Sequence, residues 1–316
     1  MFNIETKKFG NYNKIILSNR SSQEYVSIIP DSGANINELF LSNGIKIFDL
    51  VDGDKTPEEL LINDGFKGCK LLPFPNRIKN GEYQFEDKTY FLEKNNPPHA
   101  LHGLLLYKTY KVDSSHTDSD AAELNLSYIY DNENIGYPFQ FETKINIRLD
   151  QSGLTKTTTI KNLGTSPLPI GDGWHLYFKM ENNSINETAL TLPSSHQLIA
   201  DETLIPTGKS IEFDEFRNSK LIKDQHFDDC FALENNNSVA KIILTDQKNN
   251  YSIIAWQKTG FNQYNFTQIY TPKHRKSIAI EPMTCQPNAF NSKEGLILLQ
   301  PMESIQLICG VTISKA

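Results

Sequence analysis

The chain has 316 residues, of which 31 are lysine or arginine and 38 are aspartate or glutamate, so its formal charge at pH 7 is −7. This length suggests about two domains, although large all-β folds often use as many residues in one domain. An acidic chain without a basic block argues against a nucleic-acid or anionic-membrane partner.

The N-terminal segment and the cysteines bear on the cellular compartment. Residues 1–10 carry charge without the apolar run of a secretory signal, and no stretch approaches the roughly 20 apolar residues of a membrane span. The cysteines are far apart and form no C-x-x-C pair, which favours buried reduced thiols over disulfides or a zinc site. We therefore expect a cytoplasmic protein. The four cysteines are Cys69, Cys230, Cys285 and Cys309.

Short segments with a period of two residues open the chain. Residues 25–29, 36–41 and 44–49 are rich in β-branched and aromatic side chains and are separated by Asp, Ser, Asn and Gly, a pattern typical of strands joined by tight turns. The best helix signal covers residues 57–62, where Thr56 can act as the N-cap and Pro57 takes the first helical position.

The same strand pattern continues to the C-terminus. Residues 83–86 and 89–93 predict a hairpin, and the acid-rich residues 114–123 predict a solvated loop. Further predicted strands are residues 124–130, 139–149, 154–161, 189–192, 197–200, 241–245, 251–257, 268–271, 277–280, 296–299 and 305–313. With almost no amphipathic helix and no linker, the pattern predicts an all-β chain of antiparallel sheets packed face to face, as one domain over residues 1–316.

The segment 171–180 places a histidine between aromatic residues directly after two glycines. Gly171 and Gly173 suit a bend or bulge, because glycine adopts backbone angles closed to other residues. On the strand that follows, His175 and Tyr177 would share one face, which could form the floor of a site for a polar ligand. A single histidine among aromatics is more often structural, so the functional interpretation needs further polar partners.

Two loops offer such partners. Asn76 and Arg77 follow Pro73 and Pro75, which fix the backbone, and a guanidinium held there could bind a sugar or carboxylate oxygen or could instead tie down loop carbonyls. His99 and His102 lie three residues apart, but on an extended loop they would point in different directions, which argues against a metal site. His102 beside a glycine fits better as a hydrogen-bond donor to a ligand oxygen.

Two carboxylate positions complete the set of candidates. Asp228 and Asp229 lie next to aromatic residues and one of them could receive hydroxyl donors, although such pairs are also common in surface turns. Glu281 ends an apolar strand and is followed by Pro282, and an unpaired charge buried there would be costly without a purpose. The chain has no G-x-S-x-G, H-E-x-x-H, P-loop or suitably placed G-x-G-x-x-G motif, so no nucleotide or other cofactor is expected.

In their order along the chain, these motifs resemble the aldose 1-epimerase (galactose mutarotase) family. The matching residues are Asn76-Arg77-Ile78 with Gly81, Leu101-His102-Gly103, Gly173 to Phe178, Asp228 with Phe231, and Glu281-Pro-Met-Thr with Pro287 to Phe290. The resemblance implies a large antiparallel β-sandwich, the galactose mutarotase-like supersandwich, with a metal-free cleft for an aldohexose such as glucose or galactose.

The resemblance also implies roles for individual residues. Glu281 matches the general base of the family and His175 its general acid, while Arg77, His102 and Asp228 match residues that hold the sugar, and Asn76 belongs to the same binding motif. The chain departs from the family pattern at three positions, which bear on substrate preference more than on the reaction. They are Leu176 in place of proline, Leu104 in place of glycine and Tyr110 in place of tryptophan.

Anomer interconversion needs one group to remove the C1 hydroxyl proton while another protonates the ring oxygen. We expect Glu281 to be ionised at pH 7 and the pKa of His175 to be raised by nearby negative charge. Three alternatives stay open: a mutarotase for hexose 6-phosphates, a carbohydrate-binding protein without turnover, and a glycoside hydrolase that pairs Glu281 with Asp228. Both a monomer and a homodimer are compatible with the sequence.

Overall fold

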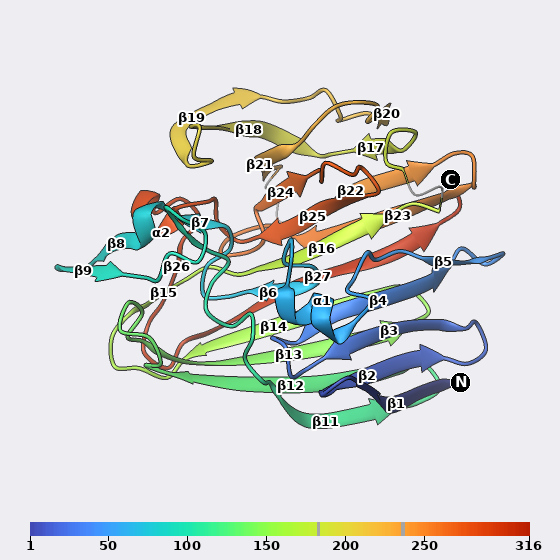
Figure 1. Cartoon of the computed structure of the whole chain (residues 1–316), viewed down its shortest axis with the longest axis horizontal. Coiled ribbons are helices and arrows are strands. Elements are labelled where there is room, and N and C mark those ends of the chain that lie inside the picture. The colour runs from blue at the N-terminus through green and yellow to red at the C-terminus, as the bar shows by residue number, and fades with distance from the viewer. Residues whose placement is uncertain (182–183, 235–237) are drawn as a thin grey trace.

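The computed structural model describes residues 1–181, 184–234 and 238–316, and within these ranges it contains 27 strands, two α-helices and one 3-10 turn. All strand pairs within the sheets are antiparallel, so the predicted all-β class is confirmed. Figure 1 shows one long sheet, with two further sheets arranged along it. None of the helices in the described ranges is long and apolar enough to cross a membrane.

The first sheet has five strands in chain order, each joined to the next by a short turn. Its N-terminal hairpin, β1 with β2, has no counterpart among the predicted strands. The strands are β1 (Phe2–Phe9), β2 (Tyr12–Asn19), β3 (Glu24–Ile29), β4 (Asn35–Ser42) and β5 (Ile47–Asp49).

The second sheet has nine strands and forms one complete layer of the molecule. Its order is β11-β12-β13-β14-β27-β23-β22-β17-β20, so the C-terminal strand β27 lies between strands from the middle of the chain. The strands are β11 (Lys111–Thr117), β12 (Ala121–Asp131), β13 (Gln140–Asp150), β14 (Gly153–Asn162), β17 (Ala189–Thr191), β20 (Lys220–Leu221), β22 (Val239–Asp246), β23 (Tyr251–Lys258) and β27 (Ser304–Ser314).

The third sheet has seven strands in the order β19-β18-β21-β24-β25-β16-β6. It brings together segments that lie up to about two thirds of the chain apart, and it carries most of the candidate site residues. The strands are β6 (Cys69–Leu71), β16 (Gly173–Lys179), β18 (Ser194–Ala200), β19 (Pro206–Glu212), β21 (Asp228–Leu233), β24 (Phe266–Tyr270) and β25 (Ser277–Met283).

Small elements connect the sheets. The helix α1 (Pro57–Ile62) is confirmed together with its cap, since the Thr56 side chain accepts a hydrogen bond from the backbone N–H of Glu59. The others are the hairpin β8 (Glu82–Phe85) with β9 (Lys88–Phe91), the pairs β7 (Arg77–Ile78) with β10 (Ala100–Leu101) and β15 (Leu168–Ile170) with β26 (Ile297–Leu299), the 3-10 turn η1 (Lys79–Gly81) and the helix α2 (Ala289–Ser292).

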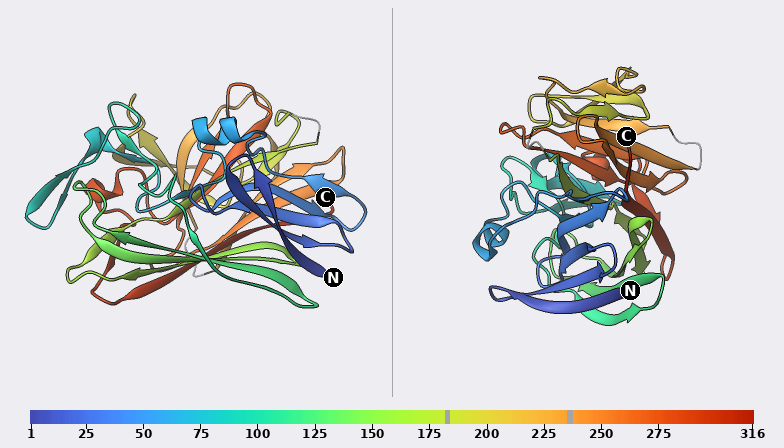
Figure 2. Two further views of the ribbon diagram at one scale, coloured as in Figure 1. Left: turned by 60° about the horizontal axis from the view of Figure 1, so that its bottom comes forward. Right: turned by 90° about the vertical axis from the view of Figure 1, so that its right-hand side faces the viewer.

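The layers pack through a continuous apolar core. The five-stranded sheet covers one part of the nine-stranded sheet, as the two views of Figure 2 show, and the seven-stranded sheet covers another. Trp174, Leu176 and Phe178 of β16 point into this core, whose buried members run from Phe2 to Val311. We therefore propose that residues 1–316 form one domain.

Two expectations about local structure were wrong. Part of the predicted loop at residues 114–123 lies in β11, an edge strand whose residues are all exposed and which pairs with β12. Its polar sequence reflects a strand without a buried face.

Gly171 and Gly173 do not adopt the positive φ angles that would mark a glycine bend. A Cβ atom at Gly171 would lie 2.5 Å from Sγ of Cys285, and one at Gly173 would lie 2.9 Å from Cβ of Pro75. Close packing, not a bend, therefore accounts for these glycines.

Candidate active site

Strand register aligns the central residues of the candidate site. In the pairing of β16 with β25, Gly173 is opposite Met283 and Leu176 is opposite Ile280, which places His175 opposite Glu281. On the other side of β25, Glu281 is opposite Gln268 of β24. Because side chains alternate between the two faces of a strand, His175 and Tyr177 share one face, as predicted, while their neighbours enter the core.

His175 and Glu281 form a direct pair. Nε2 of His175 lies 3.2 Å from Oε1 of Glu281, and the two side chains are 5% and 2% exposed. The ring of Tyr177 stacks on the imidazole with 4.9 Å between centroids, which restricts its orientation. The other polar atoms of the pair, Nδ1 of His175 and Oε2 of Glu281, are buried without a hydrogen-bond partner in the described residues. The pair therefore retains capacity to hydrogen-bond a ligand.

Burial sets the proton distribution of this pair. It raises the pKa of Glu281 well above its ordinary value, and Asp228 adds to this rise while Arg77 opposes it. It also lowers the pKa of His175 to about 3. The expectation that nearby negative charge raises the pKa of His175 was therefore wrong, and burial acts against an ionised Glu281, because removal from water disfavours both charges. Both shifts favour the neutral form of the pair, in which the two side chains share one transferable proton.

Arg77 is held by its neighbour. Oδ1 of Asn76 accepts hydrogen bonds from the backbone N–H of Arg77 at 2.9 Å and from its guanidinium Nη1 at 3.2 Å. Asn76 itself has a φ of 54°, a left-handed conformation that asparagine tolerates better than most residues. The guanidinium faces two acidic groups, Asp228 and Glu281, whose Coulomb attraction opposes the lowering of its pKa by burial.

Asp228 and Gln268 form a second hydrogen-bonded pair on this face. The side-chain amide of Gln268 donates to Oδ1 of Asp228 at 2.9 Å, while Oε1 of Gln268 is buried without a partner in the described residues. Burial raises the pKa of Asp228, and the cationic Arg77 acts in the opposite direction. The carboxylate and the free amide oxygen can both accept hydrogen bonds from hydroxyl groups.

His102 reaches the site from the loop after β10. Its Nδ1 accepts a hydrogen bond from the backbone N–H of Asn76 at 3.2 Å, so the neutral ring carries its proton on Nε2. Burial, His175 and Arg77 lower its pKa well below the ordinary value, which keeps the ring neutral. The imidazoles of His102 and His175 meet edge to face at 5.2 Å. His102 is therefore a donor from Nε2.

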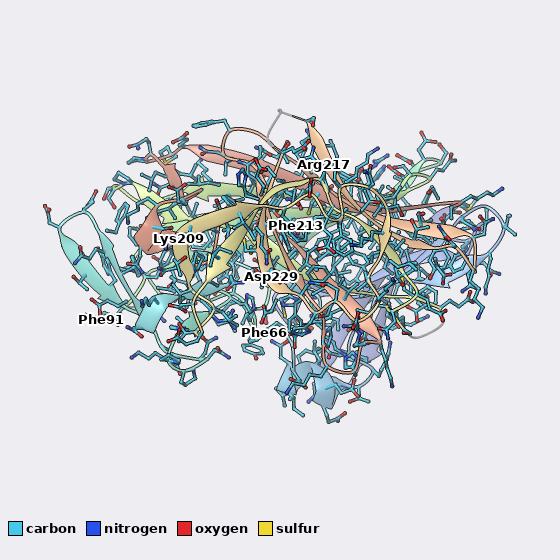
Figure 3. All side chains as sticks on the ribbon, turned by 90° about the horizontal axis from the view of Figure 1, so that it is seen from above. Phe66, Phe91, Lys209, Phe213, Arg217 and Asp229 are labelled. Atoms are coloured by element: carbon cyan, nitrogen blue, oxygen red, sulfur yellow. The ribbon has the colours of Figure 1, made fainter. Side chains whose placement is uncertain are left out.

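These residues line one cleft of about 210 Å³. Phe66 adds an aromatic wall, with its ring 4.7 Å from that of His102, and it projects from the loop after α1 (Figure 3). All six predicted site residues are among the lining residues, which are Gly65, Phe66, Asn76, Arg77, Asn96, Leu101, His102, His175, Tyr177, Asp228, Gln268, Tyr270 and Glu281.

Three residues of the cleft lie close enough together to be considered as metal ligands. Single donor atoms of His102, His175 and Glu281 lie within 4.8 Å of one another. Nε2 of His102 cannot bind a metal ion while it carries the proton required by the hydrogen bond from Asn76. Metal binding by this trio would break that contact, so the arrangement fits a hydrogen-bonding role for His102 better than a ligand role.

Two residues that the sequence analysis named lie outside the cleft, and two residues that line the cleft were not predicted from the sequence. His99 accepts from the backbone N–H of Asn80 through Nδ1, and Asp229 accepts from the Gln197 amide, so both are tied into the surrounding structure. Gln268 and Tyr270 were not singled out. Their spacing of two residues in a predicted strand indicates a shared face, but only the pairing of β24 with β25 places that face in the cleft.

Comparison with known proteins reveals clear similarities. The sequence matches the aldose 1-epimerase family over residues 15–312. The uncharacterized protein YihR of Escherichia coli is 30% identical over 253 residues, which cover 77% of each chain. Human galactose mutarotase is 26% identical over 164 residues, which cover 51% of this chain and 47% of that protein.

Solved structures share the fold at lower sequence identity. A galactose mutarotase-like protein from Clostridium acetobutylicum has a TM-score of 0.89 and 22% identity, with 100% of this chain and 99% of that chain covered. Galactose 1-epimerase from Lactobacillus acidophilus has a TM-score of 0.81 and 16% identity, with the same coverage. The predicted mutarotase-like sandwich is thus confirmed.

Proposed function

The chain belongs to the aldose 1-epimerase family, and from this premise we propose that it interconverts the α and β anomers of a free aldohexose. One observation carries the proposal: the buried side chains of a histidine and a glutamate lie 3.2 Å apart in a cleft of about 210 Å³. A protein that only binds sugar has no need of such a proton-transfer pair.

The shared proton matches the demand of the reaction. Ring opening removes a proton from the C1 hydroxyl and delivers one to the ring oxygen, so the catalyst needs one group with a proton and one without. Together, Glu281 and His175 hold one transferable proton. We assign removal of the C1 proton to Glu281 and protonation of the ring oxygen to His175, after the proton of the pair has moved to His175 on sugar binding.

Reclosure uses the same two groups in reversed roles. Rotation about the C1–C2 bond of the open-chain aldehyde presents its other face to the C5 hydroxyl. His175 then takes the proton of that hydroxyl as the new C1–O bond forms, and Glu281 returns a proton to the C1 oxygen. The sugar and the pair each end with the number of protons with which they began, and no electrons are transferred to or from the sugar.

The cleft charges favour an uncharged sugar. Arg77 is the one cationic side chain among the described residues that line the cleft, and it faces Asp228 and Glu281. A phosphate group needs several free cationic donors, so hexose 6-phosphates are the less favoured candidates.

Two-dimensional exchange NMR with equal concentrations of glucose, galactose and glucose 6-phosphate tests the proposed preference for free hexoses. We expect accelerated exchange for the free sugars; acceleration confined to the phosphate would refute it.

Arg77→Ala is expected to raise the KM for the sugar by about 10- to 100-fold, since charge-assisted hydrogen bonds to ligand hydroxyls are lost. The value of kcat should change much less, because the proton-transfer pair remains. Initial rates at varied galactose concentration measure both constants. Lys79→Ala serves as the control, because Lys79 is exposed and lies outside the cleft lining. A loss confined to kcat would show that Arg77 acts in the chemical step instead.

The value of kcat/KM should not fall as the pH is lowered to about 4. A second proton inactivates the pair only near the pKa of His175, about 3, and the shared proton leaves only above the raised pKa of Glu281. Stopped-flow polarimetry, corrected for the uncatalysed rate at each pH, measures the profile. A fall in kcat/KM as the pH rises through about 6.5 would instead indicate an ordinary imidazolium as the acid.

A further inference from the structure

A buried lysine and a buried aspartate form a hydrogen-bonded pair directly behind the cleft. Nζ of Lys70, in β6, is bound to Oδ1 of Asp172, the residue that precedes β16. Lys70 is opposite Trp174, whose side chain points into the core, whereas the next residue, His175, faces the cleft. The pair and His175 therefore lie on opposite faces of the seven-stranded sheet.

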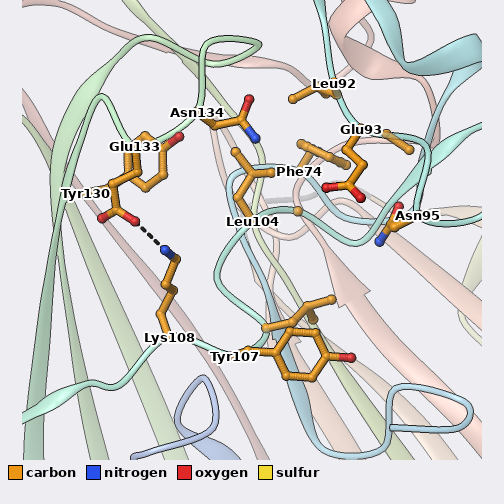
Figure 4. Close-up of a pocket in the computed structure, with 13 residues that line it drawn as sticks. Phe74, Leu92, Glu93, Asn95, Leu104, Tyr107, Lys108, Tyr130, Glu133 and Asn134 are labelled. Carbon is orange, nitrogen blue, oxygen red and sulfur yellow. Dashed lines mark hydrogen bonds and ion pairs between the residues drawn. The ribbon is translucent and has the colours of Figure 1, made fainter. Parts of the chain in front are cut away.

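This pair differs from the other lysine and arginine ion pairs of the described residues because both of its side chains are buried. The side chain of Lys70 is 2% exposed and that of Asp172 is 0% exposed. A surface pair, Lys108 with Glu133 in Figure 4, is 38% and 27% exposed. Burial and the charge of Lys156 lower the pKa of Lys70 well below its ordinary value, while the contact with Asp172 favours its charged form. The hydrogen bond joins the two side chains whichever of them holds the proton.

The carboxylate of Asp172 also binds the segment before β24. Its Oδ2 accepts a hydrogen bond from the hydroxyl of Tyr264 at 2.5 Å. Burial raises the pKa of Tyr264 well above its ordinary value, so the hydroxyl keeps its proton and remains a donor. Tyr264 lies two residues before β24, which carries Gln268 into the cleft. One buried carboxylate thus connects β6, the start of β16 and the start of β24.

The backbone of Asp172 binds the end of β25, the strand that carries Glu281. Its carbonyl accepts a hydrogen bond from the N–H of Thr284 at 2.9 Å, and its N–H donates to Oγ1 of Thr284 at 2.9 Å. The pairing of β16 with β25 is interrupted at Pro282, which directly follows Glu281 and has no N–H to donate. The contacts between Asp172 and Thr284 therefore hold the two strands together just beyond the place where His175 and Glu281 meet.

A second buried lysine lies near this pair without taking part in it. Lys156, of β14 in the nine-stranded sheet, is 2% exposed, and its Nζ lies 4.3 Å from the centroid of the Trp174 ring. Burial lowers its pKa to about 8, and its Nζ has no hydrogen-bond partner in the described residues. Lys156 therefore shares the burial of Lys70 but not its hydrogen bond to Asp172, which makes it a matched control.

Stability alone does not account for a polar pair at this place, since apolar residues of similar volume would stabilise the core as well or better. We propose that Lys70, Asp172 and Tyr264 are positioning residues, which fix the spacing of His175 and Glu281 from the core side of the sheet. They act through the strands that they connect, and none of them lines the cleft. The proposal rests on the proposed mutarotase activity, because proton transfer to and from the sugar depends on that spacing.

The double variant Lys70→Met, Asp172→Asn removes both ionisable groups with little change in size, so no buried charge is left unpaired. We expect the variant to stay folded, as checked by circular dichroism. For the sugar that the wild-type protein accelerates most, kcat should fall about tenfold, because the geometry of proton transfer is loosened. The KM should not change, since the sugar-binding residues keep their places. Lys156→Met removes an equally buried amine from the same core and should leave kcat unchanged.

Tyr264→Phe is a milder test, since it removes only the hydroxyl that binds Asp172. We expect kcat to fall about threefold, again with an unchanged KM. If the double variant does not fold, Tyr264→Phe decides, and an unchanged kcat in it would overturn the proposal.

A crystal structure of the folded variant gives a readout that does not depend on activity. The distance between Nε2 of His175 and Oε1 of Glu281 should exceed the 3.2 Å of the wild-type protein. An unchanged distance, an unchanged kcat, a loss confined to KM or an equal loss in Lys156→Met would overturn the positioning role. If the wild-type protein accelerates no sugar, the proposed function fails, while a longer distance in the variant would still support the positioning role.

Discussion

Glu281→Gln is expected to lower kcat for mutarotation by about 10²- to 10⁴-fold. Glutamine has nearly the same shape and can keep the contact with His175, but its amide cannot take up and return a proton at neutral pH. The cleft geometry should persist, so KM should change little. Progress curves by polarimetry at saturating galactose measure the effect.

The control for this variant addresses stability. A carboxyl group whose pKa is raised by burial destabilises the fold at neutral pH, because it must take up a proton on folding, whereas glutamine needs none; the free energy of unfolding should therefore not fall. Thermal unfolding followed by circular dichroism checks this point. Glu38→Gln, which alters a carboxylate paired with Lys14 in the five-stranded sheet, should retain full activity. Full activity of Glu281→Gln would exclude Glu281 as the base.

His175→Gln is expected to cause a loss of similar size, about 10²- to 10⁴-fold in kcat. The glutamine amide can place a nitrogen near the position of imidazole Nε2 and can donate a hydrogen bond to the ring oxygen. It cannot release its proton and recover it within the catalytic cycle. The same polarimetric assay measures the loss, and His116→Gln, at an exposed histidine of β11, is the control.

The double variant distinguishes a working pair from two independent groups. If Glu281 and His175 pass one proton between them, the loss in the Glu281→Gln, His175→Gln variant should be close to that of either single variant. Independent contributions would multiply, giving a combined loss of about 10⁴-fold or more. A multiplicative result would contradict the shared-proton mechanism even if each residue proved essential.

Much of the fold followed from local patterns. Alternating polar and apolar residues predicted the long strands β12, β13 and β14, and the Thr56-Pro57 signal predicted α1, because both depend on short-range chemistry. The wrong prediction of a loop at residues 114–123 also comes from relying on local patterns. An edge strand with two exposed faces has no apolar alternation, so β11 looks like a loop in the sequence.

The sequence predicted which residues form the site better than it predicted their protonation. His175, Arg77, His102, Asp228, Asn76 and Glu281 were singled out because each is an unusual polar residue in strand or proline-fixed surroundings, and all six line the cleft. Gln268 lies in an ordinary strand sequence and reaches the site only through its pairing with Glu281. The pKa directions of the central pair were missed because they depend on burial by neighbouring strands and loops, which the sequence does not reveal. The catalytic and binding roles stay predictions.

The most direct test of the central claim follows the optical rotation of freshly dissolved α-galactose and α-glucose with the wild-type protein, with Glu281→Gln and without protein. The proton-sharing mechanism predicts that the wild-type protein speeds the approach to equilibrium for at least one of these sugars. It also predicts that Glu281→Gln is close to the uncatalysed rate while remaining folded. An unchanged rate with the wild-type protein, or equal acceleration by the variant, would contradict the claim that Glu281 and His175 drive anomer exchange.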